Sequence, residues 1–94
     1  MNLPFTFKPY TGRSGTGTKQ FAATVSGLCY ATGEVEVVKD SQGKEVVSTK
    51  RLYVDGAIAI KELDNVVFEN SESDVKAIGY FYRNGVVDIK VVYL

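Results

Sequence analysis

Apolar and polar residues alternate with a period of two along most of this chain, and the 3.6-residue spacing of an amphipathic helix is nearly absent. Valine is the commonest apolar residue, and six Tyr and five Phe add side chains that suit a pleated surface. The pattern predicts an all-β protein. The spacing of the apolar runs indicates about six or seven short antiparallel strands, folded as one small barrel or sandwich domain over residues 1–94.

The C-terminal segment contains the clearest hairpin signal, the dipeptide Asn84-Gly85 between two alternating runs. Pairing Arg83 with Val86 across this turn sets the predicted register of both strands. One face of the hairpin is then apolar and expected in the core, namely Ile78, Tyr80, Tyr82, Val87, Ile89 and Val91. On the opposite face, Phe81, Val92 and Leu94 are candidates for a subunit interface, although single exposed apolar residues are also common.

A second hairpin is predicted around Asp40-Ser41-Gln42-Gly43, which reads as a type I turn closed by a left-handed glycine. The expected register pairs Val37 with Val46 and Val35 with Ser48. The turn residues Asp40, Ser41, Gln42 and Gly43 are candidate loop contacts with a partner. Asp55-Gly56 predicts a further turn, and a strand over residues 20–30 is expected to bend or bulge at Gly27.

The segment "TGRSGTGTKQF" has the glycine spacing of a phosphate-binding loop, because Gly12 and Gly17 are five residues apart. That motif requires Lys before the hydroxyl residue, whereas this chain has Thr18 before Lys19. The flanks also differ from a buried strand and a helix, since the upstream segment carries two prolines and the downstream one is β-branched. We therefore predict a flexible glycine-rich loop over residues 10–19 and no nucleotide cofactor. Its candidate contact residues are Gly12, Arg13, Ser14, Gly15, Thr16 and Gly17.

Composition narrows the chemistry that the chain can perform. The chain has no histidine, so catalysis would have to rest on carboxylates. The candidates, Asp55, Asp64, Asp74 and Asp88, each fall at a turn or strand edge where acidic residues are common, and Glu69, Glu72 and Asp74 lack the spacing of a calcium loop. No catalytic, cofactor or metal site is therefore expected. The single cysteine, Cys29, is expected as a small buried hydrophobe.

Charge and hydropathy bear on partners and location. Eleven basic and eleven acidic residues cancel, which argues against a protein dedicated to gripping nucleic acid and leaves little resistance to self-association. No apolar run approaches the length of a membrane span, and no signal peptide is evident. The expectation is a protein made in the cytoplasm that does not enter a membrane.

From residue 34 onward, the order of segments resembles the small head-completion, or stopper, proteins of tailed bacteriophages. The resemblance rests on "GKEVVS" leading into "LYV", on an apolar-polar corner that ends at Asp64, and on a closing hairpin that ends in "VVYL". It implies a β-barrel in the virion neck that forms a ring of six or twelve copies, connects the portal and its adaptor to the tail, and retains the packaged DNA. Its partners would be portal and adaptor proteins, tail proteins, and double-stranded DNA that passes through without sequence-specific binding.

The principal alternative is a small OB-like or SH3-like barrel that binds single-stranded nucleic acid by stacking bases on aromatic side chains. The predicted burial of Tyr80 and Tyr82 disfavours it.

Overall fold

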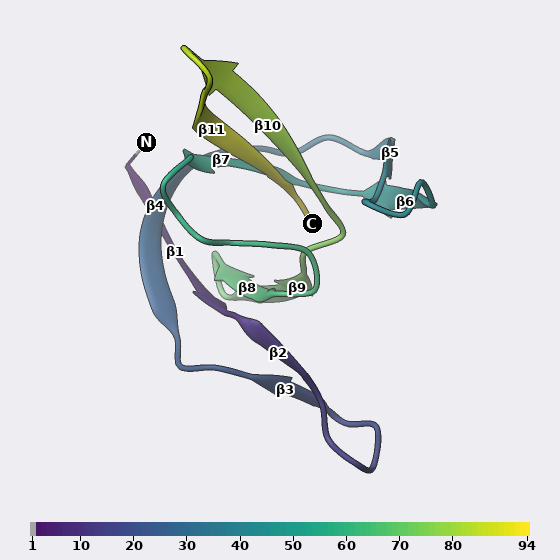
Figure 1. Ribbon diagram of the computed structural model, residues 1–94. Helices are drawn as coiled ribbons and strands as arrows, with labels where there is room; N and C mark the ends of the chain where they lie inside the picture. The colour runs from purple at the N-terminus through teal and green to yellow at the C-terminus, as the bar shows by residue number, and fades with distance from the viewer. Residues whose placement is uncertain (1) are drawn as a thin grey trace.

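The structure is a computed structural model that describes residues 2–94, which form eleven strands and no helix. Seven strands make one antiparallel sheet in the order β10-β11-β7-β4-β1-β8-β9, curled into a half-barrel (Figure 1). The all-β prediction is confirmed. The sheet strands are β1 (Leu3–Lys8), β4 (Val25–Thr32), β7 (Arg51–Asp55), β8 (Asn65–Phe68), β9 (Ser71–Asp74), β10 (Ala77–Arg83) and β11 (Val86–Tyr93). Two separate hairpins are β2 (Tyr10–Arg13) with β3 (Lys19–Phe21), and β5 (Glu36–Lys39) with β6 (Glu45–Ser48).

The core fills the concave side of the curled sheet. Alternate residues of each strand point inward, so Cys29 lies opposite Val54 across β4 and β7, and Leu52 lies opposite Val92 across β7 and β11. The edge strands β9 and β10 follow one another in the chain, and the buried Val75 lies in the short link between them. The core residues are Phe5, Phe7, Cys29, Leu52, Val54, Ile60, Val66, Phe68, Val75, Val92 and Leu94.

The proline-containing segment upstream of the glycine-rich stretch is a buried strand, which corrects the prediction from its two prolines. Strand β1 lies between β4 and β8 and buries Phe5 and Phe7. Pro4 is tolerated because β8 pairs only with Thr6 to Lys8, so β1 has a single neighbour at Pro4. Pro9 lies between β1 and β2, so its lack of an N–H removes no hydrogen bond between paired strands.

Strand β4 passes through Gly27 in continuous register, so the predicted bulge there is wrong. The glycine has another role, because a Cβ at position 27 would lie 2.9 Å from Cε1 of Phe5. The missing side chain makes room for the Phe5 ring in the core. The break in the predicted strand falls earlier, between Phe21 and Val25.

The C-terminal hairpin has the predicted turn, with φ of 51° at Asn84 and 78° at Gly85. The pairs Arg83–Val86 and Tyr82–Val87 are also as predicted. A β-bulge between Phe81 and Tyr82 then shifts the register by one residue, so that Phe81 pairs with Ile89. Beyond the bulge every predicted pairing is wrong.

The shift changes which side chains are buried. Tyr80 and Tyr82 are 49% and 67% exposed, so their assignment to the core is wrong. Val92 and Leu94 lie in the core, and their prediction as interface residues is wrong for the same reason. Phe81 is 58% exposed and keeps its candidacy for an interface. Of the remaining predicted core residues, Val91 is buried, whereas Ile78, Val87 and Ile89 are half-buried.

Replacing Tyr82 with alanine tests the corrected burial of this side chain. We expect the free energy of unfolding to fall by about 0.5 kcal/mol or less, since the ring is mostly in water and contacts chiefly Tyr80. Urea titration followed by tyrosine fluorescence measures the change. A loss above about 2 kcal/mol would indicate that the ring is buried, as the sequence had predicted.

The β5–β6 hairpin contains the predicted turn but not the predicted pairing. Gly43 has a φ of 78°, and its N–H donates to the carbonyl of Asp40 over 3.0 Å. The N–H of Asp40 donates to the carbonyl of Lys44 and closes the loop. Each residue of β5 therefore pairs one position later on β6 than predicted, and Val37 pairs with Val47 instead of Val46. Val37 and Val47 are both exposed on this hairpin.

Candidate functional site

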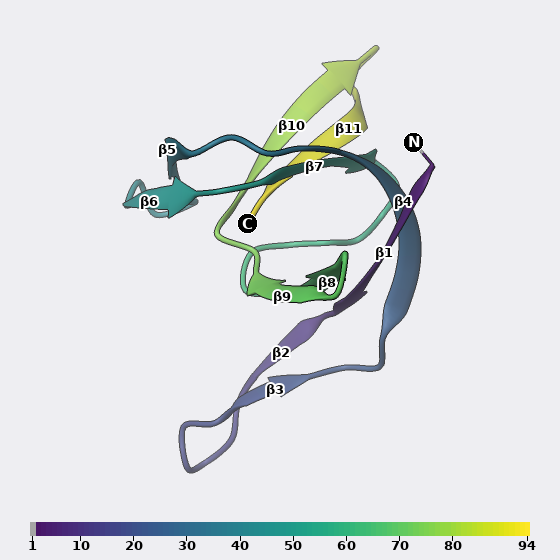
Figure 2. The same ribbon diagram turned by 180° about the vertical axis from the view of Figure 1, so that it is seen from behind.

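The glycine-rich segment forms a hairpin, β2–β3, that projects from one end of the half-barrel (Figures 1 and 2). We call residues 10–21 the arm. The prediction of a flexible loop over residues 10–19 is corrected, because Tyr10–Arg13 and Lys19 lie in paired strands. The turn is closed by the N–H of Ser14 donating to the carbonyl of Thr18 over 2.8 Å.

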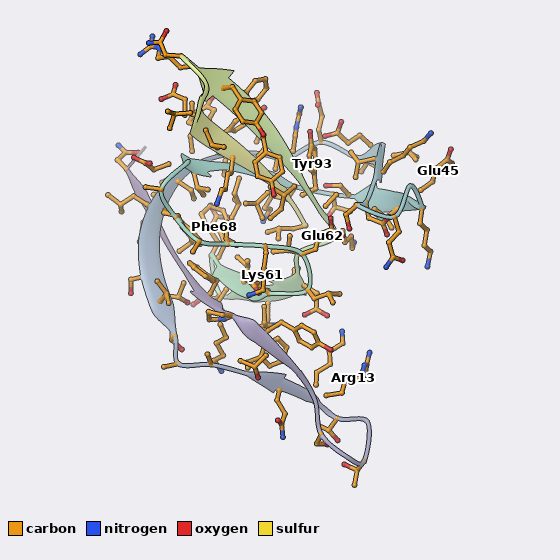
Figure 3. The ribbon with its side chains drawn as sticks, viewed as in Figure 1. Arg13, Glu45, Lys61, Glu62, Phe68 and Tyr93 are labelled. Carbon is orange, nitrogen blue, oxygen red and sulfur yellow. The ribbon has the colours of Figure 1, made fainter. Side chains whose placement is uncertain are left out.

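Glycines shape the arm at two places, since Gly12 has a φ of 125° and Gly17 a φ of 86°. Figure 3 shows the Arg13 side chain on the arm. A guanidinium N–H of Arg13 donates to the carbonyl of Gly17 over 2.9 Å. The candidate residues Gly15 and Thr16 lie in the exposed turn. A strand, β3, follows the glycines where a phosphate-binding loop would have a helix.

We call residues 61–64, between β7 and β8, the corner. The first residue of the arm, Tyr10, is hydrogen-bonded to it. The Asp64 side chain is fully buried. Its Oδ1 accepts the N–H of Tyr10 over 2.8 Å, and its Oδ2 accepts the N–H of Lys61 over 3.0 Å. The Lys61 ammonium lies 3.7 Å from Oδ1 and compensates the buried charge. Asp64, one of the candidate catalytic carboxylates, thus has both oxygens engaged in holding the chain.

The same corner holds the second hairpin. The Glu62 carboxylate accepts the N–H of Ser41 over 2.9 Å and its hydroxyl over 3.2 Å. Figure 3 shows Lys61 and Glu62 on the segment that runs between the β5–β6 hairpin and the arm. Asp40 orders its own turn, because its Oδ1 accepts the N–H groups of Gln42 and Lys44. The corner therefore fixes both hairpins relative to the half-barrel.

A third carboxylate, Asp74, ties the other strand of the arm to the sheet. Its Oδ2 accepts a bond from the Lys19 ammonium over 3.0 Å, and its Oδ1 accepts one from the Asn65 amide over 3.2 Å. Burial by itself would raise the pKa of this carboxyl. The hydrogen bonds from Lys19 and Asn65 outweigh that effect and lower the pKa below its ordinary value of 3.8.

Because the folded-state pKa of Asp74 is depressed, its stabilising contribution is present above the ordinary value of 3.8 and is lost as the pH falls through the lower folded value. We expect the amide resonances of Lys19 and Gln20 to shift in that acidic range as the arm loosens. NMR titration of the wild type and of the Asp74→Asn variant measures this. The variant should lack the transition, and a transition of equal size in both would assign it to another group.

The other predicted carboxylates have local surroundings of their own. Asp55 accepts the N–H of Ala57 over 2.8 Å within the predicted turn, and Asp88 is exposed. Within residues 2–94, no three His, Cys, Asp or Glu side chains gather closely enough to hold a metal ion. Cys29 is fully buried as predicted, and burial, followed by the charge of Glu69, raises the pKa of its thiol.

The convex side of the sheet carries an aromatic patch that the sequence reasoning missed. Tyr30 of β4 lies opposite Tyr53 of β7, with ring centroids 5.9 Å apart. Together with Thr32 and Ile89, they line an open hollow of ≈ 370 Å³. We call Tyr30, Tyr53 and Ile89 the outer face. The sequence could have indicated that each tyrosine faces away from the core, because each alternates with an apolar neighbour that is buried, Cys29 or Val54, but not that the two tyrosines pair.

No helix in the described part of the chain is long and apolar enough to cross a membrane.

Comparisons of the chain with protein-family models, curated proteins and solved structures gave no match. The arm, the β5–β6 hairpin, the corner and the outer face are therefore the features from which we infer a function.

Proposed function

We propose that this chain is a structural subunit of a bacteriophage neck, a head-completion or stopper protein whose ring connects the portal and its adaptor to the tail. The observation that carries the proposal is the pair of hairpins projecting from one half-barrel and held by one corner. A two-stranded hairpin with both faces in water is marginally stable alone. Hairpins presented in this way are suited to contacts with neighbouring subunits.

The physical chemistry of the chain supports assembly into a ring. Each copy offers contact surfaces at different ends, and such head-to-tail contacts close into rings when the rotation between copies permits. A net charge of zero gives little repulsion between copies. In a ring of six or twelve copies, DNA would pass through the centre without base-specific contacts, and the hairpins would meet the portal, adaptor and tail proteins.

A second candidate function, binding of single-stranded nucleic acid, is favoured by one observation. Tyr80 and Tyr82 are exposed on β10 with ring centroids 6.5 Å apart, and Arg83 follows them. Exposed aromatic rings beside a cation can stack successive bases. This candidate has less support, because the chain as a whole supplies no excess positive charge to attract a phosphate backbone.

Fluorescence anisotropy with a labelled oligonucleotide tests the second candidate. The neck proposal expects no saturable binding at micromolar protein and moderate salt, and no difference between the wild type and a Tyr80→Ala/Tyr82→Ala double variant. Saturable binding that the double variant abolishes would favour the nucleic-acid function.

The neck proposal itself is tested in tailed particles purified from the cells that express the gene. Mass spectrometry should find the chain in these particles, and an antibody against it should label the joint between head and tail. Purified tailed particles without the chain would contradict the proposal.

A further inference from the structure

The charges of this chain are divided unequally along its length. The first 33 residues contain Lys8, Arg13 and Lys19 and no acidic residue, which gives this part a net charge of +3. All eleven carboxylates come later, together with the other eight basic residues, so the remainder has a net charge of −3. The arm belongs entirely to the cationic part. A neutral molecule with this division favours contact between unlike ends of two copies.

The surroundings of the outer face are acidic. Asp55 lies two residues beyond Tyr53 on β7 and therefore on the same face of the sheet. On the other side of Tyr53, Arg51 is paired with both Glu34 and Glu36. The groups around the two tyrosines are therefore three carboxylates and one guanidinium, which leaves an excess of negative charge. Aromatic rings framed by carboxylates form a site suited to a guanidinium group, which is attracted by both.

The arm of a copy is at the wrong end of the molecule to reach its own outer face. Figures 1 and 2 both place the arm at one end of the half-barrel and β7, β10 and β11 at the other. The molecule is elongated, with extents of 42 × 28 × 28 Å. A contact between the arm and the outer face must therefore join two copies, and it joins them head to tail.

We propose that the arm of one copy docks on the outer face of the next, with its Arg13 guanidinium over the Tyr30–Tyr53 pair and facing Asp55. The exposed turn of the arm is built from Gly, Ser and Thr, so it is narrow enough to enter the hollow beside these rings. The partner is a second copy of this chain because its charge complements the arm. The inference rests on the proposed ring, for which it supplies the junction between subunits.

Two variants, each damaging one half of the junction, test the contact by native mass spectrometry and sedimentation. Arg13→Glu damages the arm, and Tyr30→Ser damages the outer face, where the ring is 58% exposed and outside the core. Each variant alone should weaken self-association by about tenfold or more. An equimolar mixture should form dimers with one copy of each, because only the intact arm of one and the intact face of the other can pair.

Matched controls separate docking from folding and from general surface effects. Lys44→Glu reverses a charge on the other hairpin, and Tyr82→Ser removes an exposed tyrosine outside the outer face, so both should assemble like the wild type. All four variants should keep the wild-type circular dichroism. Because the docked Arg13 faces Asp55, an Asp55→Arg change should restore association to the Arg13→Glu chain.

Assembly of the Arg13→Glu and Tyr30→Ser variants at wild-type affinity would overturn the docking inference, as would a wild type that stays monomeric at millimolar concentration. These results are distinct from failure of the neck proposal. Rings that form through other surfaces, with the chain present in particles, would leave the neck function standing without this junction. Rings that depend on Arg13 and Tyr30, with the chain absent from particles, would contradict the neck function alone.

Discussion

Replacing Gly56 with alanine is expected to lower the free energy of unfolding by about 3 kcal/mol or more, which is a large fraction of the stability of a domain this small. An alanine Cβ at this position would lie 2.1 Å from the carbonyl oxygen of Val87, and backbone atoms cannot move aside as the end of a flexible side chain does. The N–H of Gly56 also donates to the carbonyl of Asp88 over 2.9 Å, which holds the turn against β11. Chemical denaturation and the thermal midpoint measure the loss.

Gly33→Ala is the matched control for this substitution. A Cβ at Gly33 meets no atom within 4 Å, and the residue is outside the left-handed region of backbone conformation. We expect a change of about 0.5 kcal/mol or less, in either direction. Equal losses in the Gly56→Ala and Gly33→Ala proteins would mean that the turn after β7 does not approach β11 as described.

Replacing Asp64 with alanine is expected to cost about 3 kcal/mol or more and to detach the arm from the corner. The change removes a fully buried carboxylate and leaves the N–H groups of Tyr10 and Lys61 without their acceptor. Hydrogen exchange at Tyr10 should accelerate together with the loss of global stability. Both effects have the same origin, because one carboxylate joins residues 54 positions apart in the chain.

Asp88→Ala provides the comparison for the Asp64 prediction, since the Asp88 side chain is exposed. Its stability should differ from that of the wild type by about 0.5 kcal/mol or less. If the Asp64→Ala protein were equally stable, Asp64 would not be a buried structural carboxylate, and a role in chemistry would have to be considered again.

The local features of the fold could be predicted because they depend on neighbouring residues. Asn84-Gly85, Asp40 to Gly43 and Asp55-Gly56 form turns where their backbone preferences place them. Alternation of polar and apolar residues likewise indicated the all-β class. The same local rules correctly predicted the two pairs next to the turn of the C-terminal hairpin, Arg83–Val86 and Tyr82–Val87.

The register beyond those pairs could not be predicted, because a β-bulge inserts one extra residue in one strand and this insertion has no distinct sequence signal. The bulge beside Tyr82 shifts β11 by one residue relative to β10, so that Val92 lies opposite Ile78, and Val92 and Leu94 are in the core. Tyr80 lies on the same face as Ile78 but is 49% exposed. Strand β1 was missed because prolines weigh against a strand, and only the tertiary pairing explains why Pro4 is tolerated. The corner that ends at Asp64 was predicted, but its hydrogen bonds to Tyr10 and Ser41 were not, because they join residues far apart in the sequence.

The candidate site was predicted only in part. The arm turn and the Asp40 to Gly43 turn are exposed as expected for contact loops, although the arm is a paired hairpin instead of a loop. The outer face was not predicted, since the pairing of Tyr30 with Tyr53 depends on the long-range register of β4 and β7. Single tyrosines in two separate strands carry no sign that they will meet.

The most direct test of the proposed neck function is a complementation assay with a chain that lacks Ser14 to Gly17. These residues form the turn of the arm and lie outside the core, so the shortened protein should keep its core, with the arm closing again at the Gly12–Gln20 pair. Supplied in place of the wild type, it is predicted to yield particles that lose DNA or fail to join tails, with infectious titre reduced about a hundredfold or more on the scale of a lost interface contact. Full-titre particles from the shortened chain would contradict the account.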